Sequence, residues 1–218
     1  SQVPVESLTG NEELLVWDMQ TGTFTSAPIM FIDKDPYNIY RIINLSFSDG
    51  TTLKIITEHA LWDYNLNRYI FMDEQSSQYI GHWFNKQTTS DSGQFINLKV
   101  QLIDVSITTE YSVAYSPVTY NHLCYYVNGM LSMPGATEGL INIFDVDPIT
   151  MSYDTKAMTA DITQYGLFSY EEFSKLFSVS EDVFIAFNGQ FLKVSIGKGL
   201  ITIDELQNLI QQYAEFLV

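Results

Sequence analysis

The sequence is poor in cysteine and histidine, and each shortage excludes a class of site. Its single cysteine, Cys124, cannot form an internal disulfide and has no second thiol for a cysteine-rich metal site. The 3 histidines form no H-x-x-x-H motif, so we expect no zinc site and no other metal or cofactor. A single cysteine does not indicate whether the protein resides in an oxidising or a reducing compartment.

Positive charge is also scarce. Only 10 Lys and Arg residues stand against 26 Asp and Glu residues, which gives a formal net charge of -16. Such a chain repels phosphate backbones and anionic lipid headgroups. No apolar run approaches the roughly 20 residues that span a bilayer. We therefore expect neither a nucleic-acid partner nor insertion into a membrane.

What is present is a composition typical of globular proteins. Hydrophobic residues make up 46% of the 218 residues and aromatic residues 14%, whereas charged residues make up only 17%. This balance fits neither disorder nor a disulfide-stabilised miniprotein. The opening SQVPVESLTGNEE has neither the basic start nor the apolar core of a signal peptide. It reads as the middle of a structural unit, so we expect the chain to be part of a larger protein.

Residues 13–127 contain short apolar stretches, often β-branched or aromatic, between Gly, Asp, Asn and Ser turns, and this pattern predicts many strands. The expected strands are Leu14–Asp18, Ile29–Ile32, Tyr40–Phe47, Thr52–Thr57, Tyr69–Met72, Ile80–Phe84, Phe95–Thr108, Ser112–Thr119 and Leu123–Val127. Ser48-Asp49-Gly50 and Ser92-Gly93 are expected to close hairpins, because glycine accepts the positive φ of tight turns.

Beyond Pro134 the composition changes, which predicts a domain boundary near 135–150. Two Ser/Thr-x-x-Glu motifs, 169–172 and 202–205, predict helices that begin near Tyr170 and Ile203. The second helix has an apolar stripe for core packing, formed by Leu206, Leu209, Ile210, Tyr213 and Phe216 or Leu217. Between the helices, FNGQFLKVSIGKG alternates apolar and polar residues and predicts a strand or hairpin. We therefore expect a small α+β extension.

The most informative segment is FSDGTTLKIITEHALWD, residues 47–63, which reads as strand, tight turn, strand and then a histidine. It resembles the Hint domain shared by inteins and hedgehog autoprocessing proteins. In that family a D-G-x-x-L-x-V-T-x-x-H hairpin carries the histidine that polarises the N-terminal scissile peptide, and His59 stands at its position. VPVESLTGNEELLVWDMQTG and VAYSPVTYNHLCYYVNGMLS resemble the family's second strand pair and terminal strands.

This likeness covers residues 3 to about 133. It implies a mainly β fold over residues 1–135, a Hint-like antiparallel β horseshoe. We expect the α+β extension, residues 136–218, to pack against this domain. If autoprocessing is active, the resemblance makes His59 the polarising residue, with Thr57 or His122 assisting.

Both ends of the self-cleavage mechanism depart from the family pattern. The family's threonine, three residues before the histidine, is Ile56, and strand alternation directs Thr57 to the other face. The family's terminal His-Asn pair is replaced by Met133-Pro134, and proline cannot cyclise as asparagine does. Ser1 lies too close to the I-E-x-L-like segment to be the family's Cys or Ser nucleophile.

The candidate residues also have structural interpretations. For His59 we favour a hydrogen-bonded residue at a strand end, because a catalytic base needs a nucleophile and matching geometry. His122 and Cys124 stand two residues apart, which permits a Cys-His pair, although a buried cysteine is usually a small hydrophobe. His82, beside Trp83, is expected to fill a strand or lie at the surface.

Acidic residues have two roles in the sequence. The D-x-D pairs Asp33/Asp35 and Asp145/Asp147 supply hard oxygen ligands for Ca²⁺ but lack the full spacing of a calcium loop, so we interpret them as solvated turns. The pairs at 171–172 and 181–182 are expected at helix starts, where the helix dipole favours carboxylates.

We therefore expect a catalytically silent Hint-like module of a larger bacterial or phage surface or secreted protein, serving as scaffold or interaction domain. Its expected partners are other domains of the parent chain, a protein or a glycan. The acidic, lysine-poor composition favours an extracellular or cell-surface location. Two alternatives are open: an autoprocessing domain whose nucleophile lies upstream, and a carbohydrate-binding β module that uses exposed Tyr and Trp rings.

Overall fold

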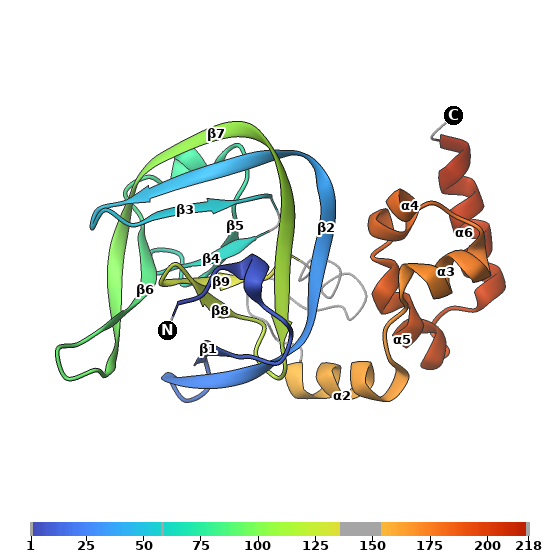
Figure 1. Ribbon diagram of the computed structural model, residues 1–218, viewed down its shortest axis with the longest axis horizontal. Coiled ribbons are helices and arrows are strands. Elements are labelled where there is room, and N and C mark those ends of the chain that lie inside the picture. The colour runs from blue at the N-terminus through green and yellow to red at the C-terminus, as the bar shows by residue number, and fades with distance from the viewer. Residues whose placement is uncertain (1, 58, 136–153, 217–218) are drawn as a thin grey trace. The chain divides into compact units, whose positions relative to one another are not determined.

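The computed structural model describes residues 2–57, 59–135 and 154–216, which fall into a β unit and a helical unit. Within the described residues the β unit has nine strands and two 3-10 helices (Figure 1). In chain order these are η1 (Val5–Ser7), β1 (Glu13–Asp18), β2 (Thr23–Phe47), β3 (Thr52–Ile55), β4 (Ala60–Asp63), β5 (Arg68–Phe71), η2 (Ser76–Tyr79), β6 (Trp83–Thr89), β7 (Phe95–Thr119), β8 (Tyr125–Val127) and β9 (Met130–Met133).

The strands pair antiparallel in the order β1-β2-β7-β6-β4-β9-β8, with β3 beside β2 and β5 beside β4. Together with the helices that follow, this sheet confirms the predicted fold class, a mainly antiparallel β protein with a C-terminal extension. The predicted boundary near 135–150 falls almost entirely outside the described residues.

Two long curved strands, β2 and β7, run side by side (Figure 1). They pair from Ile29 with Thr119 to Phe47 with Leu102, with a register shift between Asp35 and Asn38. The residues predicted as separate strands in each of these stretches do lie in strands, but the breaks predicted between them are wrong. Pro36 lies within this register shift, where the regular hydrogen-bond ladder is interrupted and a residue without an N–H is tolerated.

Glycine conformations explain which predicted turns form. Gly50 and Gly93 have φ of 84° and 82° and close the β2–β3 and β6–β7 hairpins, as predicted. Gly81 has φ of 95° and interrupts the strand expected at Ile80–Phe84. The Ile80 N–H instead donates to the Ser77 carbonyl at 3.2 Å, so the chain turns before β6 begins at Trp83.

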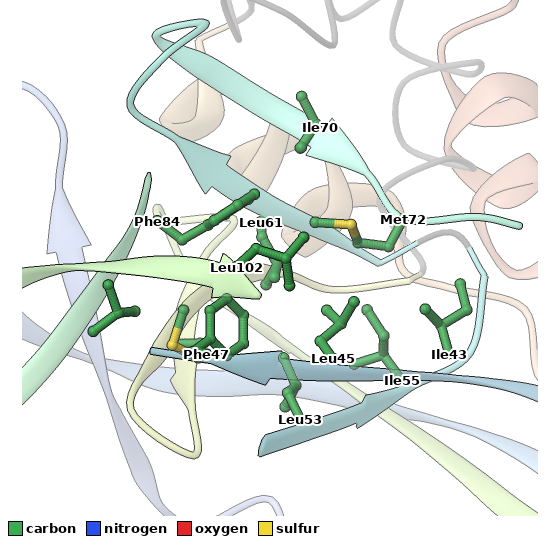
Figure 2. Packing of buried hydrophobic residues seen from close by; sticks show 12 residues of the cluster. Ile43, Leu45, Phe47, Leu53, Ile55, Leu61, Ile70, Met72, Phe84 and Leu102 are labelled. Carbon is green, nitrogen blue, oxygen red and sulfur yellow. The ribbon is translucent and has the colours of Figure 1, made fainter. Parts of the chain in front are cut away.

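The core of the β unit is formed by large side chains from strands that are distant in the sequence (Figure 2). Phe47 of β2 and Phe84 of β6 contact edge to face, with ring centroids 5.9 Å apart. Leu61 of β4 and Leu102 of β7 are fully buried in the same cluster. This packing connects β4, which directly follows His59, to the long strands.

The helical unit contains α2 (Thr155–Tyr165), α3 (Tyr170–Phe177), α4 (Glu181–Ala186), η3 (Gly189–Phe191), α5 (Leu192–Gly197) and α6 (Ile203–Phe216). The helices predicted from Tyr170 and Ile203 begin at those residues. Of the predicted stripe on α6, Leu206 and Ile210 are buried, whereas Leu209 and Tyr213 are exposed. None of the helices in the described ranges is long and apolar enough to cross a membrane.

The strand expected within 187–199 is wrong, because this stretch forms η3 and α5. Phe191 and Val194 are fully buried, and Leu192 and Ile196 pack on the helical core. These positions recur at helical spacing as well as at strand spacing, and so short an apolar run does not distinguish the two periods. Packing against α3 and α6 decides the conformation.

Replacing the first residue of the α3 capping box should destabilise the helical unit. Ser169 Oγ accepts from the Glu172 N–H at 3.1 Å, and the Glu172 carboxylate accepts from the Ser169 N–H. We expect Ser169→Ala to lower the free energy of unfolding by about 1 kcal/mol, measured from amide hydrogen exchange in α3. Ser174→Ala, inside the same helix, is the control, and an equal effect of both variants would contradict the capping role.

Candidate functional site

His59 lies directly before β4, enclosed by the end of β9. The residue is only 8% exposed, and its imidazole hydrogen-bonds to the Met133 backbone. The pairing of Ala60 with Met133 brings these two strand ends together. Gly135, two residues beyond β9, lies so close that a Cβ there would be 3.2 Å from His59 Nε2. The ring is thus in contact with the segment by which the chain leaves the β unit.

Ser116 of β7 holds the other side of this segment. Its Oγ accepts a hydrogen bond from the Gly135 N–H at 2.7 Å, and the Tyr125 hydroxyl is a second partner. Asp33 of β2 pairs with Ser116, so the two side chains project from the same face of the ribbon. His59, Ser116 and the backbone of residues 133–135 therefore form one candidate site at the end of β9, which we call the strand-exit site.

Burial favours uncharged side chains around this site. It lowers the pKa of His59 to about 4, and the hydrogen bond to Met133 only partly opposes this effect. Burial also raises the pKa of Asp33 to about 6, with a further contribution from the charge of Asp35. At neutral pH the His59 imidazole is therefore a neutral hydrogen-bonding group. It anchors the exit peptide but does not carry the positive charge that would polarise it.

The structure places the other predicted site residues elsewhere. Thr57 is half-buried in the turn between β3 and β4. His122 lies near Asp18, whose pKa is lowered first by the Gln20 N–H and least by the charge of His122. Cys124 Sγ donates to the Trp17 carbonyl at 3.3 Å, and burial raises the pKa of its thiol to about 11. A thiol in this state is a poor nucleophile, so the Cys-His pair that the spacing permits does not supply one.

The acidic pairs also have definite positions. Asp33 and Asp35 lie on β2 rather than in a turn, so their interpretation as solvated turn residues is wrong. Asp145 and Asp147 lie outside the described residues. The pairs at 171–172 and 181–182 lie in the first turns of α3 and α4, as predicted. Over the ranges that the structure describes, no three His, Cys, Asp or Glu side chains gather in a way that would hold a metal ion.

Sequence reasoning missed a hydrogen bond between a buried aspartate and a histidine in the β unit. Asp63, at the end of β4, is fully buried, and its Oδ2 lies 2.6 Å from Nδ1 of His82. Its Oδ1 accepts from the N–H groups of Asn65 and Leu66. The only sequence signal is an aspartate before a turn, and nothing in the pattern connects it to a histidine nineteen residues later.

Solved structures of inteins share this strand arrangement. A variant of the Ssp DnaB mini-intein has a TM-score of 0.51 and 16% identity, covering 61% of this chain and 82% of its own. A DnaB intein from Synechocystis has a TM-score of 0.50 and 14% identity, covering 62% of this chain and 87% of its own. The β unit has an intein-like, Hint-type fold. At these sequence identities the similarity to inteins concerns the fold alone. No protein-family model and no curated protein matches the sequence.

Proposed function

We propose that the intein-like β unit is a catalytically silent scaffold or interaction module of a larger bacterial or phage protein at the cell surface or outside the cell. The observation that carries this proposal is the state of His59. Its imidazole is buried, forms a hydrogen bond to the backbone of Met133 in the same chain, and has a pKa of about 4. A general acid or base works best with a pKa near the operating pH.

Two substitutions relative to the Hint pattern support the same conclusion. Ile56 offers no hydroxyl to a strained amide, whereas the family has a threonine there. Pro134 follows the last strand where an intein has an asparagine that cyclises. With these residues, the strand-exit site holds a peptide but lacks the groups that would cleave it. The proposed partners are other domains of the parent chain, another protein or a glycan.

Intact mass tests this proposal directly. The protein with its native flanking sequences, incubated at neutral pH with and without a thiol, is expected to keep a single unchanged mass. His59→Ala is expected to lower stability and leave this mass pattern unaltered. Thiol-accelerated cleavage that disappears in His59→Ala would contradict the silent module.

One observation favours autoprocessing as a second candidate function. The Gly135 amide is held by Ser116 Oγ, and His59 Nε2 lies against the same residue, so a peptide, a hydroxyl and an imidazole meet at the strand-exit site. In this alternative, the nucleophile lies upstream of the present chain, and His59 polarises the N-terminal scissile peptide that precedes this nucleophile. Cleavage lost in both His59→Ala and Ser116→Ala would support it.

A further inference from the structure

A second site is formed on the surface of the β unit by Tyr64, Asn65, Trp83 and Lys99. These four residues line an open pocket of about 420 Å³, within the size range of small-ligand sites. Tyr64 and Asn65 follow β4, Trp83 begins β6, and Lys99 belongs to β7. Tyr64 and Trp83 are among the Tyr and Trp rings on which the carbohydrate-binding alternative depends, whereas Asn65 and Lys99 carried no signal in the sequence.

The two segments that form the pocket are fixed to each other by hydrogen bonds. The Trp83 N–H donates to Asn65 Oδ1, and the Tyr64 N–H donates to the Trp83 carbonyl, both at 2.8 Å. The Asp63–His82 hydrogen bond lies directly beside them, since Asp63 precedes Tyr64 and His82 precedes Trp83. The walls are therefore in place before a ligand arrives, which reduces the entropy cost of binding.

The tyrosine ring is held in the same way. The buried amide of Asn85 donates to the Tyr64 hydroxyl at 2.9 Å, and that hydroxyl donates to Asn97 Oδ1 at 3.3 Å. Lys99 Nζ lies 4.3 Å from the centroid of the Tyr64 ring, a cation–π distance. The pocket thus has a rigid aromatic wall that carries an ammonium group.

The Lys99 ammonium group is unusual in so acidic a protein because it has no carboxylate partner among the described residues. Most Lys and Arg side chains in the described ranges form ion pairs with carboxylates, but Lys99 forms none there. Trp83 lines the same pocket and is 41% exposed, so an apolar aromatic side chain is accessible there. Asn65, whose Oδ1 is held by Trp83, has an amide Nδ2 left to donate.

We propose that this pocket binds a saccharide that carries a carboxylate. The Trp83 ring packs against the C–H face of the sugar, Lys99 pairs with the carboxylate, and Asn65 Nδ2 donates to a hydroxyl. One cation in one small pocket matches a single acidic sugar better than an acidic peptide, which would need several unpaired cations. This inference rests on the proposed function, since it names the chemical class and the site of its glycan partner, but it is tested separately because sugar binding is independent of peptide cleavage.

Titration with acidic and neutral sugars tests the inference. We expect disaccharides of galacturonic, glucuronic or neuraminic acid to change the NMR signal of the Trp83 indole, and neutral galactose disaccharides to bind about tenfold more weakly. Lys99→Gln should lose about tenfold in affinity for the acidic sugar, because one charge-assisted contact is removed. Trp83→Ala should abolish binding, and Trp83→Phe, which keeps a ring, should retain part of it.

Lys34 provides the matched control. Its Nζ lies 5.5 Å from the centroid of the Tyr115 ring on another part of the sheet, so Lys34→Gln removes a similar cation–π contact and should leave affinity unchanged. Circular dichroism checks that each variant is folded. The inference fails if no acidic sugar binds, if neutral sugars bind equally well, or if both lysine variants behave alike. Tighter binding of a glutamate-rich peptide than of any sugar would also overturn it.

Discussion

Acidification from about pH 7 to about pH 4 is expected to destabilise the β unit through His59 by roughly 3 kcal/mol. The unfolded chain takes up this proton near the ordinary pKa of 6.5, whereas the folded chain does so only at about 4. Between these values the unfolded state binds more protons, so the contribution of His59 is complete above pH 6.5 and is lost as the pH falls toward 4.

Asp33 acts in the opposite direction. Its folded pKa of about 6 lies above the ordinary 3.8, so the folded state binds more protons in this range and gains stability as the pH falls. We therefore expect Asp33→Asn to steepen the acid loss and His59→Gln to remove or reverse it. His122→Gln is the histidine control. Urea unfolding at about pH 7 and about pH 4.5 measures each slope, and a slope in His59→Gln equal to the native one would contradict the assignment.

Removing the buried carboxylate of Asp63 is expected to cost about 3 kcal/mol of stability. Asp63→Ala leaves the N–H groups of Asn65 and Leu66 without their acceptor and removes the charge-assisted bond to His82. The loss is placed at the low end for a buried pair, because the His82 side chain is 26% exposed and regains contact with water. The free energy of unfolding by urea measures the effect.

An exposed ion pair provides the comparison for Asp63. Glu110 pairs with Lys54 at 3.0 Å, and the two side chains are 41% and 64% exposed. Glu110→Ala should therefore change stability by less than about 1 kcal/mol. If Asp63→Ala were no more destabilising than Glu110→Ala, the hydrogen bonds of the buried Asp63 side chain would have no structural role. Asp63→Asn, which keeps an oxygen acceptor, is expected to fall between the two.

The features that were predicted correctly from the sequence are those that depend on a few neighbouring residues. Gly50 and Gly93 close hairpins because their positive φ is a local requirement, and Ser169 starts a helix because its acceptor lies three residues away. His59 was found because the turn and strand before it resemble the hairpin of the Hint family, in which a histidine follows at the same spacing. These signals are all contained within a few neighbouring residues.

Features that depend on distant residues were not predictable. The Asp63–His82 pair and the contact of Ser116 with Gly135 join segments that are distant in the sequence, and no local sequence pattern predicts the order of the strands in the sheet. The pocket at Trp83 needs three strands to assemble before it exists. Likewise, the helical state of residues 189–197 depends on packing against α3 and α6 rather than on its own periodicity.

The long pairing of β2 with β7 also determines the order in which the β unit is completed during synthesis. Parts of β2 pair early, its start with β1 and its end with β3. Among the described strands, the middle of β2, from Phe31 to Ile42, pairs only with β7. Such contacts between distant segments slow folding, because a large loop must close before they form. The middle of β2 therefore leaves the ribosome as an open strand edge, exposed to aggregation and to chaperones until residues 108–118 have been made.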